Sequence, residues 1–288
     1  MVVLGFSSGL VVFCLFPPAV FRPGEFLGGT GGGVPGGGGA GCDYIHNALT
    51  RFNLLNANDT KTPLPEGVHL VAANRPMPPE KLTKYQQLIG TLLYASIGTR
   101  PDIAFAVTRS SRYNANLTDE HHRYAQYILK YLKGTIGTRT HYDGSSHVGL
   151  IGYSDSDWGE NKDDRHSTSG QVFSLANGAI SWRSRRQKTV ALSVAEAEYM
   201  ELAETAKQAA RLRCFSQEIG RSPTHPTTIC ADNQAAIFLA MNPAQQTRIK
   251  HMDIHYHYIR EQVENEKVTI CHIPGEDNPA DLFTKSLG

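Results

Sequence analysis

The chain has 288 residues, of which 40% are hydrophobic, and its formal net charge is +1. This length and hydrophobic content suffice for one large or two modest folded domains. The near-zero charge excludes a globally basic nucleic-acid-binding protein, so any nucleic acid would have to meet a local basic face. Five cysteines, none of them in a C-x-x-C pair, favour reduced intracellular thiols over a disulfide framework or a zinc site.

Residues 1–42 have the composition of a segment outside any folded domain. Residues 1–21 are apolar and uncharged, but they lack the basic start of a signal peptide. As a membrane span they are just long enough, although Pro17-Pro18 interrupts their end. Residues 22–42 are Gly-rich and typical of a flexible linker. We expect residues 1–42 to be disordered or non-native, with membrane association through residues 1–21 as the less favoured alternative.

Residues 43–142 carry helical patterns. Apolar residues recur at helical spacing in YIHNALTRFNL (44–54) and YQQLIGTLLYAS (85–96). Two further helices are predicted to begin near Pro101 and after Thr118, and Gly134 ends the second of them. The Pro-punctuated residues 63–80 indicate a loop. We therefore expect a small, mainly helical segment here.

From about residue 148 the pattern changes to alternating strands. HVGLIGYSDSDW alternates, and QVFSLANGAISW reads as two strands joined at Asn177-Gly178, a strong hairpin signal. A capping box, Ser193 to Glu196, opens a long helix over 194–213. A strand (TTICAD), two helices (233–241 and 248–266), a strand (KVTICHI) and the turn PADLFTK follow. The order predicts an α/β domain with a mixed sheet.

Four acidic residues occupy positions that suit a metal site, namely Asp155, Glu198, Asp232 and Asp281. Asp155 lies inside an apolar strand, where a carboxylate is costly unless it is paired or binds a metal. Carboxylates that converge at strand ends are typical ligands of Mg²⁺, and two such ions can promote phosphodiester cleavage. The four residues are therefore a candidate site for that chemistry.

Each of these acids also has a plain structural explanation. Asp232 is placed to cap the helix that follows it, and Glu198 is placed like a surface helix residue. Asp281 suits the first turn of a helix. Asp157 lies two residues beyond Asp155 and points to the same face of the strand, so it competes for the same role. Spacing alone leaves these alternatives open.

Candidate nucleic-acid contacts flank these acids. A basic cluster lies between a strand and the long helix, and it is either a solvated connector or a set of phosphate contacts: Arg183, Arg185, Arg186 and Lys188. Asn233 and Gln234 follow Asp232, where they either touch a sugar or base edge or solvate a helix N-terminus. Trp158 and Trp182 are expected in the core.

Several sequence blocks resemble the ribonuclease H domain of Ty1/copia-type retrotransposon Pol polyproteins. They are YSDSDWGENKDDRHSTSGQVF, ISWRSRRQKTVALSVAEAEYMEL, ICADNQAAIFLAMNP, RIKHMDIHYHYIRE and NPADLFTK. Upstream, YQQLIGTLLYASIGTRPDIAFAV and ILKYLKGT resemble the C-terminal end of the same element's reverse transcriptase. The resemblance implies a ribonuclease H-like mixed five-stranded sheet flanked by helices over 143–288, and a reverse transcriptase or connection remnant over 43–142.

The resemblance also implies a function. The family's four acids match Asp155, Glu198, Asp232 and Asp281, which would hold two Mg²⁺ ions, with Mn²⁺ as an alternative and no small-molecule cofactor. The implied activity is cleavage of the RNA strand of an RNA–DNA hybrid. The implied partners are the hybrid and the rest of the polyprotein. The implied location is the cytoplasm, within a virus-like particle, or the nucleus.

Two departures from the family pattern qualify these expectations. The loop histidine found in many ribonucleases H is missing, because Glu276 follows Pro274-Gly275, and His272 lies in the strand instead. The polymerase motif Y-x-D-D is absent from the sequence, so residues 43–142 are not expected to copy nucleic acid. The alternative hypothesis is a catalytically silent, decayed fragment that serves at most as a nucleic-acid-binding or scaffold module.

Overall fold

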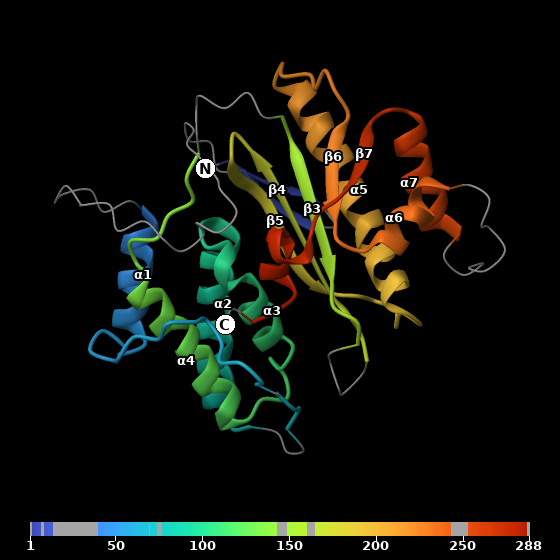
Figure 1. The fold of residues 1–288 in the computed structure, drawn as a ribbon. Helices are drawn as coiled ribbons and strands as arrows, with labels where there is room; N and C mark the ends of the chain where they lie inside the picture. The colour runs from blue at the N-terminus through green and yellow to red at the C-terminus, as the bar shows by residue number, and fades with distance from the viewer. Residues whose placement is uncertain are drawn as a thin grey trace. The chain divides into compact units, whose positions relative to one another are not determined.

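The computed structural model describes residues 2–6, 9–13, 40–68, 70–73, 77–142, 149–159, 165–242 and 253–286 (Figure 1). The chain divides into two compact units. One unit contains His141–Thr284 together with Met1–Phe26, and the other contains Leu27–Thr140 together with Lys285–Gly288. The predicted start of a helix at 248–252 lies outside the described residues.

The unit that contains Leu27–Thr140 is helical, as the sequence predicts. Its helices are α1 (Ala40–Arg51), α2 (Pro79–Gly98), α3 (Ala104–Ser111) and α4 (Asp119–Gly134), with a 3₁₀ turn η1 at Pro101–Ile103 before α3. Thr118 caps α4 and shares a reciprocal capping box with His121. The apolar faces of these helices enclose one hydrophobic core.

The other unit is built on a mixed five-stranded sheet in the order β5-β4-β3-β6-β7. Its strands are β3 (Ile151–Ser156), β4 (Thr168–Leu175), β5 (Gly178–Arg186), β6 (Thr227–Ala231) and β7 (Val268–His272). β3, β4 and β5 pair antiparallel, whereas β3, β6 and β7 pair parallel. The helices α5 (Val194–Glu218), α6 (Gln234–Met241) and α7 (Asp253–Glu264) pack with this sheet (Figure 1). The predicted ribonuclease H-like fold class is confirmed.

Helix α5 begins at the predicted capping box. Ser193 Oγ accepts a hydrogen bond from the backbone N–H of Glu196 at 3.2 Å, and Glu196 Oε2 accepts one from the backbone N–H of Leu192 at 2.9 Å. The helix continues to Glu218, five residues beyond the predicted end at 213. No Gly or Pro interrupts it before Gly220, whose φ of 74° lies in the left-handed region.

Alternate residues of β3 point to opposite faces of the sheet, and different elements cover these two faces. Ser154 and Ser156 of β3 are buried on the face that α5 covers. Asp155 points to the opposite face, where its cross-strand partner is Gly170 of β4. A 3₁₀ helix, η5 (Pro279–Phe283), packs on β3 and β4 there. An added Cβ at Gly170 would lie 2.8 Å from atoms of this segment, so the close approach depends on glycine.

The β4–β5 hairpin differs from the prediction by one residue. Its two turn residues are Ala176 and Asn177, with φ of 51° and 60°, and Leu175 pairs with Gly178. The predicted turn at Asn177-Gly178 is therefore wrong. Gly178, the first residue of β5, lies against the ring of Tyr142, and an added Cβ would be 2.1 Å from a ring atom, so this position requires glycine.

Cys230 on β6 and Cys271 on β7 are register partners across the parallel pair, with their Cα atoms 4.7 Å apart. The structure joins them in a disulfide, so the expectation of reduced thiols is wrong for this pair. The number and spacing of the cysteines in the sequence do not indicate this pair. The two residues come together only through the register of β6 and β7. Cys42 and Cys214 are free.

The described residues near the N-terminus form β1 (Val2–Phe6) and β2 (Gly9–Phe13), which pair antiparallel as a separate two-stranded sheet. The expectation that residues 1–42 add nothing to the folded domains stays a prediction. Among the described residues, we find no helix that is both long and apolar enough to cross a membrane.

Candidate metal centre

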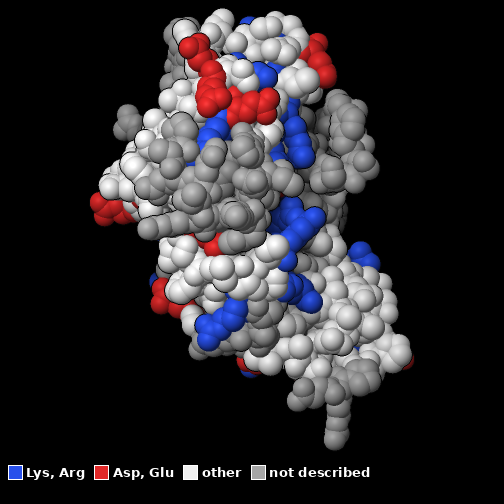
Figure 2. Space-filling view, turned by 90° about the vertical axis from the view of Figure 1, so that its right-hand side faces the viewer, with Lys and Arg blue, Asp and Glu red and all other residues white. Residues whose placement is uncertain are grey.

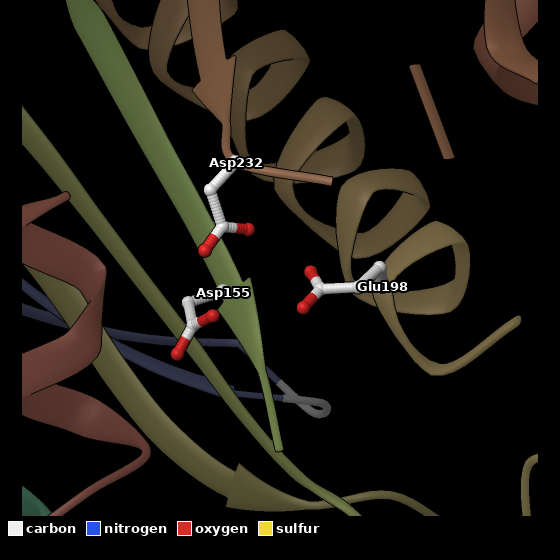
Figure 3. A group of neighbouring side chains, drawn as sticks. All are labelled: Asp155, Glu198 and Asp232. Atoms are coloured by element: carbon white, nitrogen blue, oxygen red, sulfur yellow. The ribbon is translucent and has the colours of Figure 1, made fainter. Parts of the chain in front are cut away.

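Three carboxylates from distant parts of the sequence meet at one edge of the five-stranded sheet. Asp155 comes from β3, Asp232 follows the end of β6, and Glu198 lies in the first turns of α5 (Figure 3). One oxygen of each lies within 4.8 Å of an oxygen of the other two. Asp155 and Glu198 are buried, whereas Asp232 is half-buried. The side chains point toward a common space, which the sequence reasoning expected of all three.

The strand order explains this convergence. β3 and β6 are parallel neighbours, so their C-terminal ends lie at the same edge of the sheet and place Asp155 beside Asp232. The capping box starts α5 at Val194, which puts Glu198 one turn into the helix and next to this edge. The loop after β7 completes the surroundings, because Gly275 lies so near that an added Cβ would be 3.2 Å from Asp232 Oδ2.

The 3₁₀ segment near the end of the sheet holds Asp155 in place. Thr284 Oγ1, fully buried, donates a hydrogen bond to Asp155 Oδ2. Asn278 Nδ2 donates to the backbone carbonyl of Ser154 at 3.0 Å, and Asn278 Oδ1 accepts from the N–H of Ala280 at 3.1 Å. One segment thus binds both the ligand side chain and the backbone just before it.

The other two acids considered from the sequence lie differently. Asp281 sits in η5 and is not a member of the three-carboxylate group. Its role as a fourth ligand therefore stays a prediction. Asp157, the competitor of Asp155, lies just beyond β3 and accepts a hydrogen bond from the backbone N–H of Thr168 at 2.5 Å. This contact gives Asp157 a structural role at the start of β4.

A second acidic residue on α5 lies one turn beyond Glu198. Glu201 is buried, and burial raises the pKa of its carboxyl to about 7, against the opposing effects of Arg183 and of a hydrogen bond with Ser169. Arg183 NH2 lies 3.8 Å from Glu201 Oε1 and 3.6 Å from Glu204 Oε2. Burial is the largest single effect on Glu204 and disfavours its ionisation as well, but the hydrogen bond from Lys207 at 2.7 Å and the nearby positive charges of Lys207, Arg183 and Arg185 together lower its pKa.

The predicted nucleic-acid contacts fall into different surroundings. Arg183 has ion-pair partners on α5, and Asn233 Oδ1 caps α6 by accepting from the N–H of Ala236 at 3.0 Å. Arg185 and Arg186 are half-buried, while Lys188 and Gln234 are exposed. On the face drawn in Figure 2, Lys and Arg side chains are visible in several places. The assignment of these residues to phosphate, sugar or base contacts stays a prediction.

Trp158 does not lie in the core, contrary to expectation. It is 55% exposed, and its Nε1–H donates to the backbone carbonyl of Ala191 at 3.2 Å. The residue follows the end of β3 in a loop, where alternation no longer buries every second side chain. Trp182 on β5 is half-buried.

Three residues near the carboxylates were not identified by the sequence analysis. Thr284 and Asn278 belong to a turn whose position against β3 depends on tertiary packing. Gln187 directly follows β5 in the basic stretch RSRRQK, and no sequence pattern distinguishes this neutral residue from its charged neighbours. In the short NPADLFT block, the Thr three residues after the candidate ligand Asp281 is the signal that the sequence offers for Thr284.

The sheet and the carboxylates at its edge define a ribonuclease H-like domain with a candidate divalent-metal centre. Retrovirus-related Pol polyproteins are similar to this chain over most of its length. The one from transposon TNT 1-94 of Nicotiana tabacum is 41% identical over 84% of the chain, and that from transposon RE2 of Arabidopsis thaliana is 35% identical over 85%. Over these stretches the chain is homologous to Pol polyproteins from copia-type transposons, and it spans 18% and 17% of the length of these two relatives.

The search of solved structures gives a weaker likeness. A crystal structure of LC11-RNase H1 in complex with an RNA/DNA hybrid aligns with 46% of this chain and 92% of its own chain, with 17% identity and a TM-score of 0.36. No protein-family model matches the sequence.

Proposed function

We propose that residues 143–288 form an endoribonuclease that cleaves the RNA strand of an RNA–DNA hybrid. The observation that carries the proposal is the convergence of Asp155, Glu198 and Asp232 at one sheet edge. Similarity to copia-type Pol polyproteins and the sequence blocks described above support the same function. Residues 43–142 would be the remnant of the reverse transcriptase or its connection.

The donor set fits a divalent cation that prefers oxygen. At a Mg²⁺–oxygen distance of about 2.1 Å, ligands on opposite sides of the ion are about 4.2 Å apart. The three oxygens lie within 4.8 Å of one another, so small side-chain rotations would bring them to bonding distance. We propose Mg²⁺, with Mn²⁺ as an alternative, held by these three residues and, in a two-ion arrangement, by Asp281. When bound, such ions activate water and neutralise the leaving 3′ oxygen.

The chain's own residues have separate tasks in this proposal. Thr284 fixes the rotamer of Asp155 by donating a hydrogen bond to its Oδ2. Lys188 and Gln234, both exposed, are proposed to contact the hybrid backbone. Recognition of the hybrid would depend on backbone shape and on the 2′-hydroxyl groups of the RNA strand.

A cleavage assay on the full chain tests this function. The substrates are an RNA–DNA hybrid labelled on the RNA strand, with duplex DNA and duplex RNA of the same sequence as controls. We expect cleavage of the hybrid's RNA with Mg²⁺, none with EDTA, and none of the control duplexes. An inactive chain that still binds the hybrid would favour the alternative of a decayed, binding-only fragment, and cleavage that persists in EDTA would contradict the metal site.

A further inference from the structure

One buried glutamine connects the elements that carry two of the three carboxylates. Gln187 directly follows β5 and is 7% exposed. Its Nε2 lies 3.2 Å from Ser156 Oγ, 2.9 Å from Ser169 Oγ and 2.9 Å from the backbone carbonyl of Ala197. A single amide group therefore contacts the end of β3, the start of β4 and the first turn of α5.

These contacts are adjacent in sequence to the ligands. Ser156 follows Asp155 on β3, and Ala197 precedes Glu198 on α5. No hydrogen bond of a β-ladder joins a helix to a strand, so the spacing between these two backbones depends on side-chain packing and on such bridges. The contacts of Gln187 thus lie next to the two backbone segments that carry Asp155 and Glu198, and they help to set the distance between them.

The backbone of Gln187 is itself well held. Its N–H donates to the carbonyl of Ser167 at 2.8 Å, and its carbonyl lies 2.8 Å from His166 Nδ1. The amide side chain thus extends from a backbone fixed on both sides. A neutral donor at this position also adds no positive charge that would compete with a cation for the carboxylates.

We propose that Gln187 is a positioning residue, which sets the spacing of Asp155 and Glu198 and thereby the affinity of the site for divalent cations. The inference rests on the proposed function, because it assumes that the carboxylates bind a metal. Groups that orient metal ligands without touching the ion typically change metal affinity about 10- to 100-fold when they are removed.

The chain offers a matched control for this proposal. Gln208 on α5 is 5% exposed, and its Nε2 donates to Ser181 Oγ on β5 at 3.1 Å. It also connects a helix to a strand through a buried amide, but it lies ten residues beyond Glu198 on the same helix. Gln208→Met and Gln187→Met therefore remove comparable groups, and only the second lies next to the carboxylates.

The test measures Mn²⁺ binding to the full chain by electron paramagnetic resonance, without any need for activity. We expect Gln187→Met to weaken Mn²⁺ binding at least about tenfold and Gln208→Met to change it less than about twofold, although both lower the thermal midpoint. Equal Mn²⁺ affinities for Gln187→Met and the wild type would overturn the inference alone. A wild-type chain that binds no Mn²⁺ would overturn the proposed function and the inference with it.

A milder variant keeps the test decisive if Gln187→Met does not fold. Ser156→Ala removes the longest of the three contacts, at 3.2 Å, together with the hydrogen bond that Ser156 Oγ donates to the backbone carbonyl of Asp157 at 2.9 Å, and it leaves the glutamine in place. We expect a smaller loss of Mn²⁺ affinity in the same direction, in a protein whose circular dichroism matches the wild type. A folded Ser156→Ala variant with unchanged affinity would contradict the positioning role.

Discussion

Asp155→Asn separates the electrostatic role of the carboxylate from its packing. Asparagine keeps the size of the side chain and an oxygen that can accept from Thr284, but it removes one negative charge from the group of three. We expect two opposite effects. Hybrid cleavage should fall by at least about 10²-fold, the scale lost when one electrostatic element of a preorganised site is removed. Without metal, the fold should become more stable.

The size of the stabilisation follows from the geometry. Two unit charges at 4.8 Å, the outer distance in the group, repel by about 3.5 kcal/mol at an effective dielectric constant of about 20. Asp155 takes part in two such pairs, but solvent at the half-buried Asp232 screens them, so we expect about 1–3 kcal/mol in total. At about 2–4 °C per kcal/mol for a domain of this size, the midpoint in EDTA should rise by roughly 2–12 °C.

The assay compares wild type, Asp155→Asn and Asp157→Asn by thermal unfolding in EDTA and in Mg²⁺, and by hybrid cleavage. Asparagine at 157 can still accept from the N–H of Thr168, so this variant should keep most activity and the full stabilisation by Mg²⁺. Asp155→Asn should lose that stabilisation. The reasoning is refuted if the two variants behave alike, or if Asp155→Asn lowers the midpoint in EDTA.

Four further outcomes are expected. Burial raises the pKa of Glu201 to about 7, so the folded chain binds this proton more tightly than the unfolded chain does. The free energy of unfolding should therefore fall as the pH rises from about 4.5 to 7. Glu201→Gln should flatten that dependence, measured by urea titrations at several pH values. Lys188→Gln should weaken hybrid binding and lower its salt slope by about one, whereas Arg183→Gln, which loses its ion pairs with α5, should mainly lower stability. Gly170→Ala should lower the midpoint and the metal affinity, since its Cβ would lie 2.8 Å from the segment that holds Asp155; a wild-type midpoint would contradict this packing. Deleting residues 1–42 should shift the midpoint of the remainder by no more than about 1–2 °C, and a larger drop in calorimetry would show that they pack on it.

Local signals in the sequence predicted the elements that carry the three candidate ligands. The capping box at Ser193 correctly started α5, and a carboxylate within the apolar strand at Asp155 marked the site. The parallel pairing of β3 and β6, which brings Asp232 to the same edge, followed from the fold class. These features depend on residues close together in sequence or on a known strand order, so pattern reasoning reaches them.

What the sequence did not predict depends on distant contacts. The hairpin turn lies one residue earlier than predicted, and Gly178 enters β5 beside the ring of Tyr142, which is distant in sequence. The pairing of Cys230 with Cys271 arises from the register of two parallel strands, 41 residues apart. Gln187 gives no local signal, since its three acceptors lie on separate elements. Tertiary packing determines each of these features, and a window of neighbouring residues does not contain the information needed to predict them.

The contacts of Thr284 and Asn278 bear on how the site forms during synthesis. Thr284 is 129 residues from Asp155, and Asn278 is 124 residues from Ser154. When Asp155, Glu198 and Asp232 have been synthesised, the ribosome has not yet added the turn whose Thr284 holds Asp155 by a hydrogen bond. Until that turn emerges, the nascent sheet exposes the Gly170 surface that η5 later covers. Any product that stops before residue 278 would carry all three carboxylates and still lack the means to hold Asp155 in place.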